Sequence, residues 1–234
     1  MTTFALVHGA WHSGACWDPT AELLRAAGHD VVAPDLPCED PSAGVEAYAA
    51  AVLEALADHL SDDLVVVGHS LGGLTIPLVA AARPVRELVF LCAFVPLPGA
   101  SAAEDLMVLD DTFAPEWPEL SSHLTSHEDG TASWPPDAAI DAFYHDCSAE
   151  LAASAAALLR RQAWTPSTEA SPLVAYPDVP ARAIVCAQDR VLGAEACARH
   201  AAERLDATVI RLGGGHSPML AQPAALVDAL TRTL

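Results

Sequence analysis

Ser70 stands at the centre of a G-x-S-x-G pattern, in the stretch GHSLGG. The valine-rich run LVVVG (64–68) precedes it, and LGGLTIPLVAAA (71–82), with helical spacing, follows it. A serine between a strand and a helix sits on a sharp turn. The positions two residues before and after it must lack side chains to avoid a collision, and they are occupied by Gly68 and Gly72. The pattern favours a nucleophilic hydroxyl at the carboxyl edge of a sheet, near the positive end of a helix. The alternative is a chance G-x-S-x-G in a glycine-containing turn.

A serine hydroxyl is a weak nucleophile at neutral pH and needs a base. Of the ten histidines, only His216 follows the last predicted strand, in the run GGGHSP, where three glycines would let the imidazole reach over the sheet edge. An acid must hold the imidazole tautomer, and Asp189 lies two residues past the preceding strand, in AIVCAQDR. Each residue alone could be an ordinary loop residue. Together, the order Ser70, Asp189, His216, each just past a different strand, predicts a catalytic triad.

A serine nucleophile also needs backbone donors for the oxyanion that forms on the carbonyl oxygen. The amide of Leu71, at the start of the predicted helix, should be one donor. The loop HGAWH, after the first predicted strand, should supply the other. Gly9 allows a close approach of that loop, which leaves the amide of Ala10 to point at the anion.

The elements that must position these residues alternate along the chain. Six short apolar runs predict strands, at 4–8, 30–34, 64–68, 88–94, 183–187 and 208–212. Helical patterns lie between them, chiefly at 20–28, 45–60, 193–205 and 223–234. This alternation predicts an α/β fold, with a mostly parallel sheet of about six strands flanked by helices. The apolar runs show little polar alternation, as burial of both sheet faces requires.

The interval 96–180 breaks this order. It shows no convincing strand and is rich in prolines, serines, acids and aromatic residues. A loop of that length without structure would be unusual in a compact domain. We therefore predict that residues 96–180 form a mainly helical cap, with its main helix or helices in 143–162. The cap would be inserted in a core made of residues 1–95 and 181–234.

The charge of the chain limits its partners. Eleven basic residues against 31 acidic ones give a net charge of −20, which disfavours binding to nucleic acid or to anionic membranes. No apolar run approaches the roughly 18 residues of a membrane-spanning helix. The N-terminal MTTFALVHG lacks the basic region of a signal peptide, and the six cysteines show no C-x-x-C spacing. We expect a cytoplasmic protein with reduced thiols that binds a small-molecule substrate. Whether it is a monomer or a homodimer is left open by the sequence.

Five stretches carry a resemblance to a known family: FALVHGAWHSGACW, GHSLGG, FYHDCS, QDR and GGGHSPML. Together they resemble the α/β-hydrolase superfamily, and more narrowly the branch with plant methylesterases, salicylate-binding esterases and hydroxynitrile lyases. The resemblance spans nearly the whole chain. It implies hydrolysis of a small carboxylic ester, or of a lactone or thioester, through an acyl-enzyme on Ser70 and without a cofactor. It also implies oxyanion donors at Ala10 and Leu71 and a cap over the pocket.

Two positions depart from the lyase members of this branch. The lyases carry threonine at the position of Gly9, and lysine directly after the catalytic histidine, where this chain has Ser217. The chain contains no lysine, which disfavours cyanohydrin cleavage. Two alternatives to an esterase remain: a specialised biosynthetic enzyme, such as a cyclase, lyase or cofactor-free perhydrolase, and a ligand-binding protein that retains the triad.

Aromatic residues are concentrated in the cap, where some would line a substrate pocket and most would form the cap's own core. The predicted pocket residues are Trp11, Phe94, Trp134, Phe143 and Trp164. No Arg or Lys occurs from Glu87 to Leu159, so the cap offers no obvious clamp for a substrate carboxylate. The sequence therefore predicts a neutral, apolar or aromatic ester. Arg160, Arg161 and Arg190 are the arginines that could still bind a substrate carboxylate.

One pair of histidines has the spacing of metal ligands. His123 and His127 are four residues apart and are followed by Glu128, in a stretch without a strong helical pattern. We predict no metal site.

Overall fold

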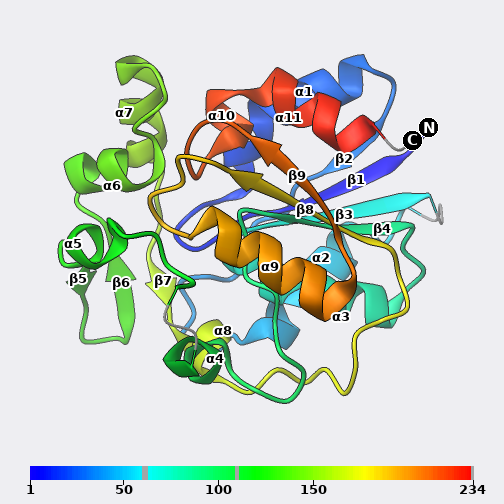
Figure 1. Ribbon diagram of the computed structural model, residues 1–234, viewed down its shortest axis with the longest axis horizontal. Helices are drawn as coiled ribbons and strands as arrows, with labels where there is room; N and C mark the ends of the chain where they lie inside the picture. The colour runs from blue at the N-terminus through cyan, green and yellow to red at the C-terminus, as the bar shows by residue number, and fades with distance from the viewer. Residues whose placement is uncertain (60–62, 109–110, 233–234) are drawn as a thin grey trace.

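The computed structural model describes residues 1–59, 63–108 and 111–232. A six-stranded parallel sheet runs through it in the order β2-β1-β3-β4-β8-β9 (Figure 1). The strands are β1 (Thr3–Val7), β2 (Asp30–Val32), β3 (Leu64–His69), β4 (Glu87–Leu91), β8 (Ala181–Cys186) and β9 (Thr208–Leu212). All six predicted strands are present, which confirms the predicted α/β sheet.

Helices cover both faces of this sheet. They are α1 (Asp18–Ala26), α2 (Val45–Ala55), α3 (Ile76–Ala82), α9 (Ala194–Leu205), α10 (Pro218–Ala221) and α11 (Pro223–Thr231), with 3-10 turns η1 (Gly14–Trp17) and η2 (Ser70–Leu74). The predicted helix 45–60 is shorter than expected, and its residue 60, like residues 233–234 of the last predicted helix, lies outside the described residues.

Alternate residues of the central strands face opposite layers. Val65 and Val89 belong to a buried cluster with residues of α1 and α11, whereas Val66 belongs to one with residues of α2 and α3. Both layers exclude water, so both sets of side chains are apolar, and this explains the lack of polar alternation. Figure 1 shows that β1 begins and α11 ends at one end of the molecule, while α5, α6 and α7 lie at the other.

The cap is more mixed than the sequence predicts. Its described helices are α4 (Ala102–Val108), α5 (Trp117–Ser121), α6 (Pro136–Phe143), α7 (Ala149–Ala157) and α8 (Thr165–Thr168). It also contains an antiparallel sheet of β5 (Thr125–Ser126), β6 (Thr131–Ser133) and β7 (Gln162–Ala163). The expectation that this interval holds no strand is therefore wrong. Strands of two or three residues are too short to show the alternation on which a strand prediction depends.

The predicted helical stretch 143–162 is also interrupted. α6 ends at Phe143, and α7 starts only after Ser148, whose hydroxyl accepts a hydrogen bond from the backbone N–H of Leu151 at 3.3 Å. Ser148 thus caps a new helix, and a loop joins the two. The separation of the cap from the core as a domain stays a prediction.

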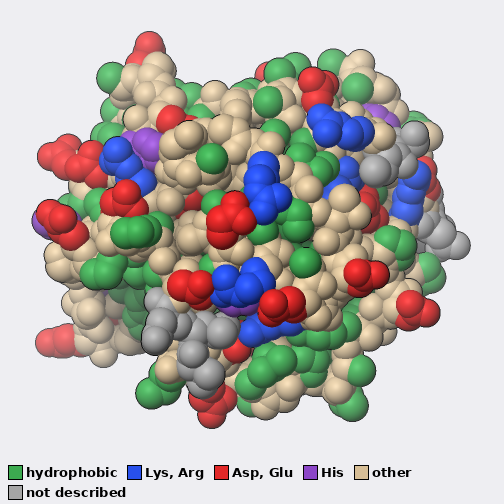
Figure 2. All heavy atoms as spheres, in the orientation of Figure 1, with side chains coloured by type: hydrophobic (Ala, Val, Ile, Leu, Met, Phe, Trp, Pro, Cys, Tyr) green, Lys and Arg blue, Asp and Glu red, His purple; other side chains and the backbone are tan. Residues whose placement is uncertain are grey.

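No helix in the described ranges is long and apolar enough to cross a membrane. On the face shown in Figure 2, arginine and acidic side chains are interspersed. The structure contains exposed ion pairs, such as Arg199 with Asp111 at 2.8 Å and Arg211 with Glu195 at 2.8 Å. The excess negative charge is therefore not accompanied by a basic patch on this face.

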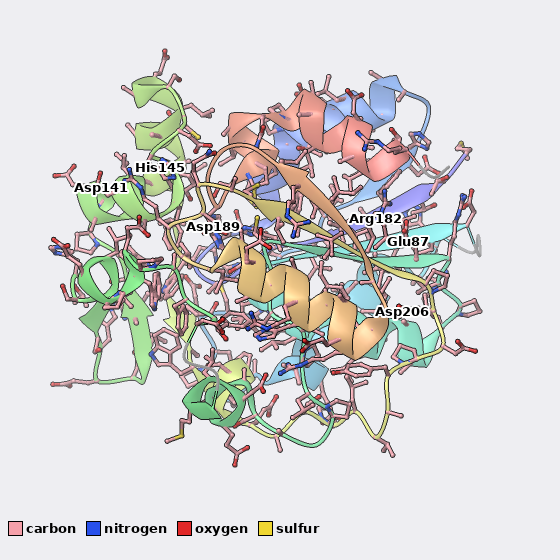
Figure 3. The ribbon with its side chains drawn as sticks, viewed as in Figure 1. Glu87, Asp141, His145, Arg182, Asp189 and Asp206 are labelled. Atoms are coloured by element: carbon pink, nitrogen blue, oxygen red, sulfur yellow. The ribbon has the colours of Figure 1, made fainter. Side chains whose placement is uncertain are left out.

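An ion pair at the start of β8 is largely buried. The guanidinium of Arg182 lies 2.6 Å from the carboxylate of Glu87 on β4, and Figure 3 shows the two side chains next to each other. The Arg182 side chain is 1% exposed and that of Glu87 is 13% exposed. The guanidinium also donates to the carbonyl oxygens of Ala229 (2.5 Å) and Leu230 (3.1 Å), so it ties α11 to the sheet.

Candidate active site

Ser70 lies where β3 passes into η2. Its φ is 52°, in the left-handed region that few non-glycine residues adopt, and it is 8% exposed. A Cβ at Gly68 would lie 2.8 Å from the carbonyl oxygen of Gly72, and one at Gly72 would lie 2.8 Å from that of His8. The sharp turn therefore leaves no room for side chains at Gly68 and Gly72, for the reason that the sequence pattern suggested. Such backbone strain costs about 1–3 kcal/mol and is typical of functional sites.

The imidazole of His216 is paired with the carboxylate of Asp189. Nδ1 of His216 lies 2.8 Å from Oδ2 of Asp189, and both side chains are buried. The other carboxylate oxygen accepts from the N–H groups of Val191 (2.8 Å) and Leu192 (3.0 Å). Because Nδ1 donates its proton to Asp189, Nε2 is the nitrogen that can accept a proton.

The residue before Ser70 links it to this pair. His69 donates from Nε2 to the carbonyl oxygen of His216 at 2.8 Å, and the two rings are 4.7 Å apart between centroids. The structure thus brings Ser70, Asp189 and His216 to the carboxyl edge of the sheet, past β3, β8 and β9. Sequence reasoning did not assign a role to His69. Its position inside GHSLGG was the available signal.

The two predicted oxyanion donors flank Ser70. Leu71 begins the turn after it, and the loop after β1 approaches so closely that a Cβ at Gly9 would lie 2.8 Å from the Cβ of Ser70. The N–H of Ala10 makes no hydrogen bond with any other residue that the structure describes. The roles of Ala10 and Leu71 as donors stay predictions, and an unused N–H beside Ser70 is what such a role requires.

Two more buried histidines hold the loop after β1. Nδ1 of His12 lies 2.7 Å from the carbonyl oxygen of Ala10 and therefore donates to it, which leaves Nε2 to accept from the hydroxyl of Tyr144 at 2.9 Å. In the same way, His8 donates to the carbonyl of Gly9 and accepts from the N–H of Leu36. Burial lowers the pKa of His8 to about 4 and that of His12 to about 3, and it lowers the pKa of His69 well below its ordinary value. All three are neutral in the folded protein near pH 7.

We expect these histidines to make the protein acid-sensitive. In the unfolded chain they bind protons below about pH 6.5, whereas in the folded chain they stay neutral until about pH 4 or lower. The unfolded state then holds more protons, so the free energy of unfolding falls as pH falls, by about 1.4 kcal/mol per pH unit for each histidine.

Urea unfolding at pH 7, 6 and 5 measures this slope. Replacing His12 with phenylalanine should lower overall stability, yet reduce the slope near pH 5 by one histidine's share, about 1.4 kcal/mol per pH unit. A flat profile between pH 7 and pH 5 would contradict the prediction.

Aromatic side chains gather beside His216. The ring of Trp11 contacts those of Trp134 (5.6 Å between centroids), Phe143 (5.9 Å) and Trp164 (5.6 Å). Phe143 in turn lies 5.9 Å from His216. Four of the predicted pocket residues therefore form one cluster next to His216.

Phe94, the fifth predicted pocket residue, contacts the backbone of Ser70. Its N–H donates to the carbonyl oxygen of Ser70 at 3.2 Å, and its ring contacts Phe113, which stacks on Trp117. Contact with substrate stays a prediction for all five aromatic residues.

Comparison with known proteins shows the family of the chain. A model of the alpha/beta hydrolase family matches residues 4–229. The chain belongs to the alpha/beta hydrolase family.

Curated alpha/beta hydrolase relatives match over part of their length. The carbendazim hydrolyzing esterase of Nocardioides sp. (strain SG-4G) is 40% identical over 133 residues, which cover 53% of this chain and 52% of the relative. Methylesterase 7 of Arabidopsis thaliana is 38% identical over 104 residues, 40% of each chain. The chain thus spans about half or less of the length of these relatives. Plant methylesterases are among the relatives, which confirms the predicted branch.

A solved structure matches over nearly the whole chain. The pyrethroid hydrolase from Sphingobium faniae JZ-2 superimposes with a TM-score of 0.82 at 26% identity, covering 99% of this chain and 96% of that one. The alpha/beta hydrolase fold predicted from the sequence is therefore confirmed.

The two histidines with metal-ligand spacing lie in different surroundings in this alpha/beta hydrolase. Nε2 of His127 bonds to the hydroxyl of Ser133 at 2.8 Å, across the β5–β6 hairpin, and His123 is exposed. Within residues 1–59, 63–108 and 111–232, no group of three His, Cys, Asp or Glu side chains could hold a metal ion. The six cysteines are free thiols.

Proposed function

We propose that this protein is a serine hydrolase that cleaves a small, neutral carboxylic ester through an acyl-enzyme on Ser70. The observation that carries the proposal is the buried hydrogen bond between His216 and Asp189, at the sheet edge where Ser70 occupies a sharp turn. The names of the relatives support it, because a carbendazim hydrolyzing esterase and a methylesterase are among them.

The geometry suits a two-step reaction. The hydroxyl oxygen of Ser70 attacks the ester carbonyl carbon while Nε2 of His216 takes the hydroxyl proton, and the carbonyl oxygen becomes an oxyanion held by the N–H groups of Ala10 and Leu71. The C–O bond to the alcohol then breaks, and the leaving oxygen receives the proton from His216. A water molecule attacks the acyl-enzyme by the same route, which releases the acid and restores Ser70. The Asp189 carboxylate stabilises the imidazolium at each stage.

The contacts of the arginines support a neutral substrate. Two of the three candidate clamps pair with carboxylates: Arg160 lies 3.5 Å from Glu39, and Arg161 lies 3.1 Å from Asp129. The third, Arg190, donates to the backbone carbonyl of Asp141 at 3.4 Å. An aromatic cluster beside His216 would instead bind an apolar or aromatic acyl or alcohol group by burial of area.

We therefore expect the protein to prefer uncharged esters. For two esters of equal size, one neutral and one with a free carboxylate away from the scissile bond, kcat/KM should be at least about tenfold higher for the neutral ester, because the net charge of −20 and the paired arginines disfavour an anion. Steady-state kinetics at low ionic strength measures the ratio. A higher kcat/KM for the anionic ester would refute the substrate class.

The lyase alternative is not favoured by the structure. A Cβ at residue 9 would lie 2.8 Å from that of Ser70, so a threonine there would require the loop or the serine to move. Ser217, which stands in place of the lyases' lysine, has no charge and is fully buried.

Rapid mixing with p-nitrophenyl acetate tests the proposed reaction. We expect a burst of p-nitrophenol of about one equivalent per chain and an acetyl group on the peptide that contains Ser70. Ligand binding without turnover would give no burst, and an acetyl group on another residue would refute the proposed nucleophile.

A further inference from the structure

The segment FYHD, residues 143–146, joins α6 to α7 in the cap. In the sequence it belongs to a stretch that helps to identify the family, and the catalytic steps above assign it no role. In the structure its four residues contact three of the loops that carry candidate catalytic groups, those of His216, Asp189 and Ala10.

Two of the contacts reach the loop that carries His216. The carboxylate of Asp146 accepts a hydrogen bond from the N–H of Gly215 at 2.6 Å, directly before the base. The Phe143 ring lies 5.9 Å from the His216 ring, tilted by 38°. The cap therefore contacts both the backbone just before His216 and the ring of His216.

The next contact reaches the loop that carries Asp189. A ring nitrogen of His145, Nε2, lies 3.1 Å from the carbonyl oxygen of Gln188, directly before the acid. Figure 3 shows His145 on the cap and Asp189 on the neighbouring loop of the core. Gln188 also exchanges hydrogen bonds with Gly214, from its backbone N–H at 2.9 Å and through its side-chain oxygen. The acid and base loops are thus bonded to each other and to the cap.

The fourth contact reaches the loop after β1. The Tyr144 hydroxyl donates to His12, which fixes the carbonyl of Ala10. Because a fixed carbonyl limits rotation about the Ala10 backbone, this contact restrains the residue whose N–H is a candidate oxyanion donor.

The glycines before His216 provide independent support. A Cβ at Gly215 would lie 2.6 Å from His145 Nε2 and 3.0 Å from Asp146 Oδ1. A Cβ at Gly214, where φ is +81°, would lie 2.6 Å from Asp146 Oδ2. A Cβ at Gly213 would meet nothing closer than 3.9 Å. The sequence suggests that this run lets the imidazole reach over the sheet edge, whereas in the structure two of its glycines admit the FYHD segment.

We infer that the FYHD segment fixes the positions of the acid, base and oxyanion loops relative to one another, and that Asp146 is a positioning residue for His216. Asp146 acts through the backbone of Gly215 and touches no reacting atom. The inference rests on the proposed hydrolase function for its kinetic consequences only. Freed from this hydrogen bond, the loop would hold the imidazole in the reactive orientation for a smaller fraction of the time, which lowers kcat while substrate binding is kept.

Two substitutions at Asp146 separate this role from a structural one. Asp146→Ala should lower kcat by about 10- to 100-fold and change KM by less than about twofold. Asp146→Asn keeps an oxygen that can accept from Gly215, so it should recover most of kcat without moving the pH profile of kcat/KM. The matched control is Asp141→Ala in α6, because Asp141 is exposed and its carboxylate makes no hydrogen bond in the described part of the chain.

A glycine pair makes the complementary test. Gly215→Ala should push the loop away from His145 and lower kcat, whereas Gly213→Ala should leave kcat near that of the unmodified protein. Circular dichroism is recorded for each variant to check that it folds. If Gly215→Ala unfolds, the Asp146 variants decide the matter.

One readout does not depend on turnover. The proton shared by His216 and Asp189 should give a downfield NMR signal that broadens in Asp146→Ala and is restored in Asp146→Asn. A wild-type protein with this signal but no ester turnover would refute the proposed function and leave the positioning role standing. Equal kcat and signal in Asp146→Ala and the wild type would overturn the inference, as would an Asn variant no better than Ala.

Discussion

Replacement of Ser70 by alanine is expected to lower kcat/KM for a p-nitrophenyl ester by about 10⁴-fold or more, because no other hydroxyl would be placed to form the acyl-enzyme. His216→Ala should cause a similar loss. The double variant should be little worse than either, since nucleophile and base act as a unit. Steady-state kinetics, with an active-site titration to count competent molecules, measures these losses.

The fold should survive the loss of this hydroxyl. Ser70 holds a φ of 52°, so Ser70→Gly should even raise the melting temperature while it abolishes activity, because glycine adopts this backbone without strain. Ser101→Ala is the control: Ser101 is about as buried as Ser70, bonds to Glu104 in the cap, and should keep most of the activity. More than about a tenth of the wild-type rate in Ser70→Ala would exclude the proposed mechanism.

Among the substitutions discussed, Arg182→Ala is expected to lower the free energy of unfolding most, by about 3–5 kcal/mol. The substitution leaves the carboxylate of Glu87, which is only 13% exposed, without its partner, and it frees two carbonyl oxygens at the end of α11. Guanidinium unfolding measures the loss as a lower midpoint at constant slope.

Two variants show whether the buried charge is the cause. Arg182→Met keeps much of the volume but not the charge, so it should be about as destabilising as Ala if the unpaired carboxylate dominates. Glu87→Gln together with Arg182→Met should recover part of the loss. Arg211→Ala, in a pair whose side chains are 55% and 76% exposed, should cost less than about 1 kcal/mol. A similarly small effect at Arg182 would contradict the assignment.

The sheet and the candidate catalytic residues were predictable because the relevant signals are local. Each strand is a short apolar run, and the carboxyl ends of parallel strands meet at one edge, so residues just past β3, β8 and β9 had to come together. The bond between His216 and Asp189 follows from this rule, although they are 27 positions apart.

The contacts of the cap could not be predicted in this way. The bond between Tyr144 and His12 joins residues 132 positions apart, and it depends on how α6 and α7 pack on the core. The neutral state of His12 depends on the same packing, since burial is what lowers its pKa. β5 and β7 are two residues long, and only their pairing with β6 identifies them as strands.

The position of the chain ends matters for attaching the protein to a surface. β1 begins and α11 ends at the end of the molecule opposite α5, α6 and α7 (Figure 1). The chain has no lysine, so amine-reactive supports find no side chain to couple. A tether fused ahead of β1 or behind α11 would therefore attach each molecule by this end and leave α5, α6 and α7 facing the surrounding liquid.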